Sequence, residues 1–145
     1  MGDSVFISYS HLDSARVQTL VSAIADVGVS VWLDVDRLAP GTRWRTEIRA
    51  GIRAGGAMVV CFSSQLQNAS RSYVHEELTL AIDELRVRPW DRSWLYPVRL
   101  DNCEIPDRPL GGGETLRDLQ HFDLFPDLNA KSGEFAQVLS RRLLT

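Results

Sequence analysis

The chain has 145 residues, of which 44% are hydrophobic and 24% charged, a composition typical of one globular domain with a substantial core. A formal net charge of −3 gives no electrostatic reason to expect nucleic acid or an acidic membrane surface as a partner. The apolar runs are shorter than the roughly 18–20 residues of a membrane span, the N-terminus lacks a signal-peptide pattern and two cysteines make no disulfide framework, so we expect a cytoplasmic protein.

The first half of the chain alternates predicted strands with predicted helices. In order, we predict a strand at 5–7, a helix from 13 or 14 to about 27, a strand at 29–33, a helix from 42 or 44 to 54 and a strand at 57–63. Gly28 ends the first helix as a C′ glycine, and Pro40–Gly41 punctuates the loop before the second. The last of these strands is continuously apolar, as expected for a strand buried on both faces of a parallel sheet.

The same alternation continues to the end of the chain. We predict a helix capped by Ser70 or Ser72 and running to Leu85, a fourth strand within 94–101, a long loop with room for a short turn of helix, a short fifth strand within 119–123 and a helix at 132–144. Pro97 favours an edge or a bulge for the fourth strand. Strands and helices at this spacing predict an α/β fold, a flavodoxin-like open sheet of about five parallel strands with helices on both faces.

Polar side chains follow the predicted strands at their carboxyl ends, where ligands bind in such sheets. They are Tyr9, Ser10 and His11 after the first strand, Asp34 after the second, and Ser63 and Ser64 after the third. The first turn of the helix ending at Leu85 shares this edge, which brings Tyr73 and Glu77 toward it.

Two adjacent glutamates of this helix are separated by their helical phase. At ~100° per residue, Glu76 lies almost opposite the apolar stripe and is expected to be a solvated surface acid. Glu77 lies at the edge of the buried face, one turn after Tyr73 and on the same side. An aromatic ring beside a carboxylate suits a ribose- or base-containing ligand, but a helix-forming glutamate gives the same pattern, so the pattern alone leaves both open.

Several other chemistries lack their motifs. The three histidines and two cysteines share no metal-ligand spacing. The sequence has no G-x-G-x-x-G after its first strand and no G-x-S-x-G. A receiver-like phosphoacceptor site at Asp34 would also need an acidic pair after the first strand and a lysine after the last.

Four segments, taken together, resemble the Toll/interleukin-1 receptor (TIR) domain, particularly its bacterial form. They are VFISYS, SVWLDVDRLAPGTRW, AMVVCFS and SYVHEELTLAI, and WLYPVRLD and LRDLQHFDL look like that family's fourth and fifth strand regions. The resemblance covers nearly the whole chain as one domain, residues 1–145. It implies a flavodoxin-like sheet with strand order 2-1-3-4-5.

The resemblance also implies an activity. Enzymatic members cleave the nicotinamide–ribose bond of NAD⁺ with a glutamate in an aromatic-V-x-x-E pattern, and this pattern runs here from Tyr73 to Glu77. The catalytic role therefore falls on Glu77, with NAD⁺ as substrate and neither a cofactor nor a metal. Many members have Trp at the position of Tyr73. The substrate-binding residues expected around Glu77 are Tyr9, Ser10, Asp34, Arg37, Arg43, Trp44, Ser63 and Tyr73.

The resemblance further implies self-association. Residues 34–45 correspond to a mobile loop that mediates TIR–TIR contacts and gates the ligand site, with Asp36, Leu38, Pro40 and Gly41 as assembly residues. Bacterial members commonly serve anti-phage defence together with a fused or separate sensor module. The alternative is a non-enzymatic adaptor that acts by TIR–TIR contacts alone; such members usually lack the glutamate, so Glu77 favours the enzyme.

Overall fold

Five parallel strands form the central layer of the protein, and the computed structural model describes residues 4–33 and 40–144. Across the sheet the strands are β2 (Ser30–Leu33), β1 (Ser4–Ser8), β3 (Ala57–Phe62), β4 (Leu95–Arg99) and β7 (Phe122–Asp123). Each neighbouring pair runs parallel. This confirms the predicted flavodoxin-like sheet, in which β7 takes the fifth position of the 2-1-3-4-5 order.

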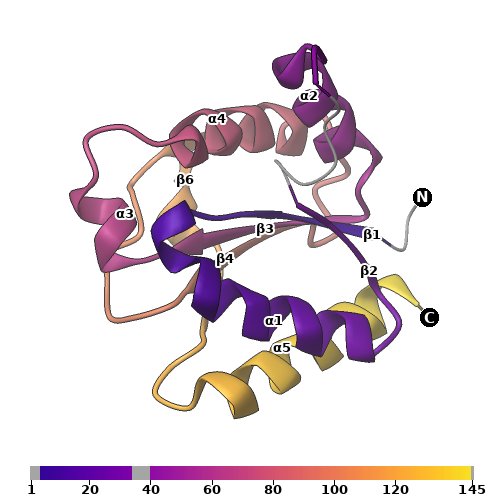
Figure 1. Ribbon diagram of the computed structural model, residues 1–145. Coiled ribbons are helices and arrows are strands. Elements are labelled where there is room, and N and C mark those ends of the chain that lie inside the picture. The colour runs from indigo at the N-terminus through magenta and orange to yellow at the C-terminus, as the bar shows by residue number, and fades with distance from the viewer. Residues whose placement is uncertain (1–3, 34–39, 145) are drawn as a thin grey trace.

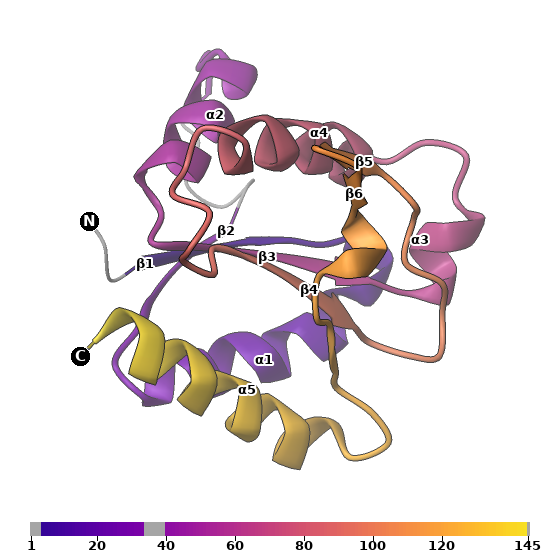
Figure 2. The same cartoon turned by 180° about the vertical axis from the view of Figure 1, so that it is seen from behind.

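Helices cover both faces of the sheet (Figures 1 and 2). One face carries α1 (Ser14–Asp26) and α5 (Leu128–Leu143), and the other carries α2 (Trp44–Ala54) and α4 (Tyr73–Leu85). The longest of these, α5, has 16 residues, and no helix in the described ranges is both long and apolar enough to cross a membrane.

Successive side chains of the central strands enter two separate cores, because strand residues point alternately to opposite faces. Val5 and Ile7 of β1 pack in the core beneath α1 and α5, whereas Phe6 packs in the core beneath α2 and α4. Ser8 follows Ile7 and therefore faces α4. The alternation thus places a buried hydroxyl under that helix.

Four features of the fold differ from the sequence-based prediction. A short helix, α3 (Ser64–Asn68), occupies part of the predicted loop after β3, and its N-cap Ser63 accepts a hydrogen bond from the Leu66 amide at 3.1 Å. Helix α5 begins at Leu128 rather than at Ser132, because Asp127 caps it and accepts a bond from the Ala130 amide at 3.2 Å. The predicted long loop contains a hairpin of β5 (Pro109–Gly111) and β6 (Glu114–Thr115). The short turn of helix expected in this loop is the 3₁₀ turn η2 (Leu116–Asp118). A second 3₁₀ turn, η1 (His11–Asp13), precedes α1.

Pro97 lies inside the sheet, because β4 has β3 on one side and β7 on the other. Trp94 and Leu100 exchange backbone bonds with β3, whereas the Arg99 carbonyl accepts a bond from the β7 side. Residues alternate between the two sides, so Pro97 shares the side of Arg99. Strand β7 pairs only from Val98 onward. The missing N–H of Pro97 therefore costs no hydrogen bond to any described strand, because β7 does not extend along that part of β4. The first three residues of β4 have the predicted edge character on the β7 side.

Candidate functional site

A pocket of about 680 Å³ lies where β1 ends and α4 begins. Three segments form its wall: residues 9–12 after β1, residues 69–76 at the start of α4, and Arg45 in the first turn of α2. The carboxyl edge of the sheet therefore carries a pocket of a volume ordinary for small-molecule sites. Of the residues predicted to bind substrate, the pocket wall includes Tyr9, Ser10 and Tyr73.

Two aromatic rings meet beside this pocket. Ser72 caps α4 by accepting a bond from the Val74 amide at 3.2 Å, so the helix begins with Tyr73, whose side chain is 58% exposed. The ring of Trp44, the first residue of α2, meets the Tyr73 ring edge-on with centroids 4.9 Å apart. The first turns of α2 and α4 are thus joined by an aromatic contact that leaves much of Tyr73 open to a ligand.

An ion pair joins the same two turns. Arg45 Nε donates to Glu76 Oε1 at 2.8 Å, and the Arg45 guanidinium lies 5.3 Å from the centre of the Trp44 ring. Glu76 is a surface acid, as predicted, but it is also engaged in an ion pair, with its side chain 36% exposed. It lines the pocket and holds an arginine that sequence reasoning missed. Residues 45 and 76 are far apart in sequence, and no local pattern indicates that their helices start side by side.

Glu77 is buried more deeply than its helical phase predicts. Its side chain accepts a hydrogen bond from the Ser8 hydroxyl, and the two residues are 1% and 0% exposed. A helical wheel treats the helix alone, whereas the start of α4 also packs against β1, which covers its flank. The wall of the pocket includes Tyr9 and Glu76, the chain neighbours of this pair, but neither Ser8 nor Glu77. Glu77 is therefore next in the chain to the pocket wall without contributing to it.

Ser63 lies away from this pocket, in a polar network at the start of α1. Its hydroxyl donates to Asp13 at 2.5 Å, and Asp13, 1% exposed, also pairs with Arg16 at 2.5 Å. Arg16 reaches Asp101 at 3.2 Å. Burial alone would raise the pKa of Asp101, but hydrogen bonds from Ser64 and Arg16 outweigh it and hold that pKa below its usual value. The network ties together the segments that follow β1, β3 and β4.

The remaining predicted site residues belong to the segment before α2. Asp34, Asp36, Arg37 and Leu38 lie outside the described residues. Arg43 occupies the N-cap position of α2, is exposed and does not line the pocket. Pro40 and Gly41 are also exposed, and Gly41 has a φ of +85°, a conformation that glycine adopts without strain. The roles of these residues stay predictions.

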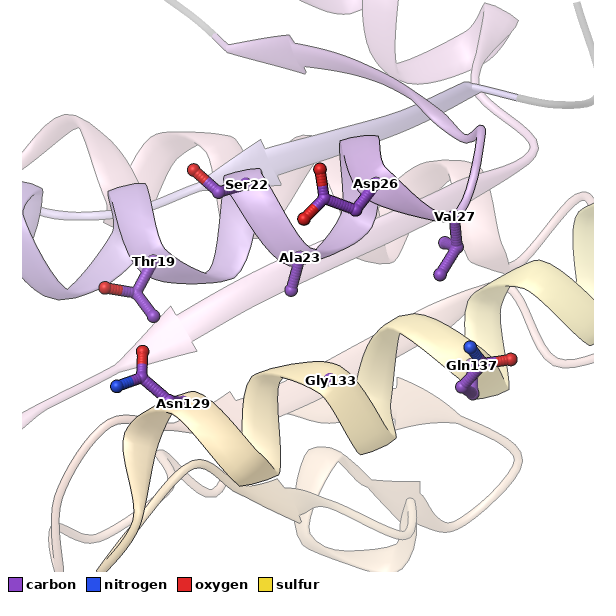
Figure 3. Close-up of a pocket in the computed structure, with 8 residues that line it drawn as sticks. All are labelled: Thr19, Ser22, Ala23, Asp26, Val27, Asn129, Gly133 and Gln137. Atoms are coloured by element: carbon purple, nitrogen blue, oxygen red, sulfur yellow. The ribbon is translucent and has the colours of Figure 1, made fainter.

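A second hollow, of about 540 Å³, lies between α1 and α5 on the opposite face of the sheet (Figure 3). Its wall is made of small and polar side chains, among which Asp26 is the one ionisable group. The thiols offer little chemistry either, since burial raises the pKa of Cys61 and raises that of Cys103 to about 11. Within residues 4–33 and 40–144, no three His, Cys, Asp or Glu side chains gather as metal ligands.

The sheet order, the two helical layers and a pocket at the carboxyl end of β1 define a flavodoxin-like α/β domain. A profile of the TIR domain family matches residues 5–139. The chain belongs to the TIR domain family.

Solved structures of TIR proteins share the fold at low sequence identity. The TIR domain of the Toll-related receptor TRR-2 from Hydra magnipapillata is 18% identical, with a TM-score of 0.71 over 97% of this chain and 98% of its own. A TIR-STING receptor from C. gigas is 19% identical, with a TM-score of 0.70 over 94% of this chain and 39% of its own. The TIR domains of the activated Roq1 resistosome, which recognises the pathogen effector XopQ, are 23% identical, with a TM-score of 0.57 over 68% of this chain and 57% of their own.

A bacterial protein is similar in sequence. It is the uncharacterized protein y4cD of Sinorhizobium fredii, 29% identical over 102 residues. The match covers 68% of this chain and 15% of the relative, so the chain corresponds to a small part of that longer protein.

Proposed function

We propose that this TIR domain hydrolyses NAD⁺ at the nicotinamide–ribose bond. The observation that carries the proposal is the position of Glu77, which lies one helical turn after Tyr73 and next in the chain to Glu76, two residues that line a pocket of about 680 Å³. The rings of Tyr73 and Trp44 supply flat apolar surfaces for a base. TIR domains include enzymes of this kind, which is the family-level support.

The chemistry needs one carboxylate. Breaking the N-glycosidic bond builds positive charge on the ribose, and a nearby carboxylate stabilises that oxocarbenium character. Nicotinamide leaves as a neutral group, so no general acid is required. Water attack on the ribose yields ADP-ribose, and attack by a nucleophile within the substrate yields a cyclic isomer.

The covered position of Glu77 supports a requirement for activation. In the conformation described here the carboxylate accepts a bond from Ser8 and has almost no exposed surface. A ribose can reach it only after the side chain or the pocket wall moves. We propose that association with further copies of the domain, through the segment that contains Pro40 and Gly41, supplies this change, in a bacterial defence or signalling role.

The test is nicotinamide release from NAD⁺, followed at increasing concentrations of the domain. We expect specific activity to rise steeply with protein concentration. Glu77→Gln keeps the shape of the side chain and its bond from Ser8 but removes the charge, so turnover should fall about a hundredfold or more. The matched control is Asp83→Asn, an exposed acid on the same helix and away from the pocket, which should leave turnover unchanged.

The competing function is that of a non-enzymatic adaptor, and the burial of Glu77 is the observation in its favour. No nicotinamide release at any concentration would replace the enzyme with the adaptor, whereas release that survives Glu77→Gln would overturn the catalytic role of Glu77.

A further inference from the structure

The wall of the pocket beside Glu77 contains charged side chains as well as aromatic rings. Two arginines, Arg45 and Arg71, line it from different helical turns and loops, and His11 and His75 also contribute to the wall. The acid in this wall is Glu76, and its charge is taken up by Arg45. A site with two guanidinium groups and one carboxylate, lined by the rings of Tyr9 and Tyr73, suits an anionic ligand that carries a base.

The geometry of the Arg45–Glu76 pair allows an anionic ligand to replace Glu76 as the partner of Arg45. The two side chains are 71% and 36% exposed, and a pair this open to water is screened and weak. The contact uses Arg45 Nε, whereas the two Nη groups carry four of the five N–H donors of a guanidinium. A diphosphate brings two negative charges and oxygens that accept two parallel bonds from one arginine, so it competes effectively with a single carboxylate.

We propose that Arg45 binds the diphosphate of the substrate and that Glu76 competes with this diphosphate for Arg45. The inference rests on the proposed function for the identity of the ligand, an adenine dinucleotide, and assigns the diphosphate to a residue other than the predicted Arg37 and Arg43. Glu76 then sets specificity: a ligand without a strong anionic group cannot displace it. The Trp44 ring under the Arg45 guanidinium keeps that group at the pocket rim while the partner changes.

The experiment measures the dissociation constants of ADP-ribose, inorganic pyrophosphate and adenosine by calorimetry, so that no turnover is needed. Arg45→Gln should weaken ADP-ribose and pyrophosphate about tenfold and leave adenosine unchanged, because a charge-assisted pair is lost. Glu76→Gln should tighten ADP-ribose and pyrophosphate about two- to fivefold, the range of an exposed ion pair. The double variant should behave like Arg45→Gln, since a competitor without its target has no effect.

Matched controls lie on the same two helices. Arg49→Gln on α2 and Asp83→Asn on α4 change the same charges at exposed positions outside the pocket and should leave all three constants unchanged. Higher salt should weaken pyrophosphate binding to the wild type more than to Arg45→Gln.

The two proposals fail separately. If Glu77-dependent NAD⁺ cleavage occurs while Arg45→Gln binds ADP-ribose as tightly as the wild type, the assignment of Arg45 is wrong and the enzyme stands. If Glu76→Gln weakens ADP-ribose, Glu76 is not a competitor. If pyrophosphate shows the expected pattern but NAD⁺ is not cleaved, the anion site stands and the enzyme does not.

Discussion

Ser8 and Glu77 join the first strand to the helix that follows the third strand. Ser8 reaches α4 because strand side chains alternate between the two faces, and the hydroxyl is the group that meets the Glu77 carboxylate there. Both side chains are cut off from water, and a buried polar group that loses its hydrogen-bond partner costs free energy. The bond therefore couples the position of the carboxylate to the stability of the domain.

This coupling is measurable by a double-mutant cycle of Ser8→Ala and Glu77→Ala. We expect the two losses in unfolding free energy to be non-additive by about 1–3 kcal/mol, because each single change leaves the other group without this partner. Urea denaturation of the wild type, the two single variants and the double variant gives the coupling energy.

Ser10 supplies the control for that cycle. Its hydroxyl accepts a bond from the Leu12 amide at 3.3 Å and caps η1. Ser10→Ala and Glu77→Ala should add to within about 0.5 kcal/mol. Additivity of the Ser8 pair as well would mean that the Ser8–Glu77 bond contributes nothing in solution.

At this scale the sequence distinguishes Glu77 from Glu76 by phase, and the structure places the two as differently as the phase requires. Helical phase does not predict how deeply a side chain is buried, because the burial of Glu77 depends on β1, a segment about 70 residues earlier. The contact between Arg45 and Glu76 was hidden for the same reason. Both depend on how α4 packs against a segment distant in the sequence, which is β1 for Glu77 and α2 for Glu76.

The position of α2 depends on a close approach to β2. The ring of Trp32 stacks on Phe6 with centroids 4.7 Å apart, and it lies directly beneath Gly51 in the middle of α2. A Cβ built on Gly51 would lie 3.2 Å from two carbons of the Trp32 ring. Glycine at this position lets α2 pack closely on the Trp32 indole. This packing fixes the position of the first turn of α2, which carries Trp44 and Arg45.

We therefore expect Gly51→Ala and Gly133→Ala to differ. An alanine in a helix interior normally gains about 0.5–1 kcal/mol over glycine. Gly133 in α5 lies beside the hollow of Figure 3, and a Cβ there meets nothing within 4 Å, so Gly133→Ala should gain that amount. Gly51→Ala should gain less or lose stability, because the indole must move.

Unfolding free energies from urea titration compare the two variants directly. An equal gain in both variants would show that the α2–Trp32 contact is looser than the structure indicates.

Elements with strong periodicity were predictable and the others were not. The five strands of the central sheet and helices α1, α2 and α4 follow from apolar spacing, and Ser72 caps α4 as predicted. Helix α3 spans five residues, too few for a periodic signal. The first turn of α5 lacks apolar periodicity and is helical because Asp127 caps it. The β5–β6 hairpin turns on three glycines with positive φ, a turn signal that the prolines around it obscured.

An ion pair joins the edge strand β7 of the sheet to its neighbour β4. Arg99 of β4 donates to both oxygens of Asp123 of β7, at 2.7 and 2.8 Å. These hydrogen bonds hold the pKa of Asp123 below its usual value. A carboxylate with a lowered pKa in the folded state adds stability above its unfolded pKa of about 3.9, and this stability is lost as the pH falls below about 4.

Asp123→Asn should accordingly destabilise the domain by about 1–2 kcal/mol at pH 7, since a two-pronged charged contact is lost. The difference from the wild type should shrink as the pH falls below about 4, where the wild-type carboxylate also becomes protonated. Chemical denaturation at pH 7 and at pH 3 measures both differences.

Glu134→Gln is the control, because its contact with Lys131 is 3.8 Å long and its side chain is 60% exposed. That change should be nearly neutral at both pH values. A loss in Asp123→Asn that stays constant with pH would assign it to packing rather than to charge.

Pro97 has a consequence for the behaviour of many copies at high concentration. Because β7 pairs only with the last two residues of β4, the earlier part of that strand has an unmatched hydrogen-bonding side. An unmatched strand side is a template on which an extended segment of another molecule can grow as cross-β aggregate. A proline on that side offers no donor, so an incoming strand finds a gap in its ladder. The residue that looked like a defect in the predicted strand thereby makes this side of β4 a poor template for a further strand.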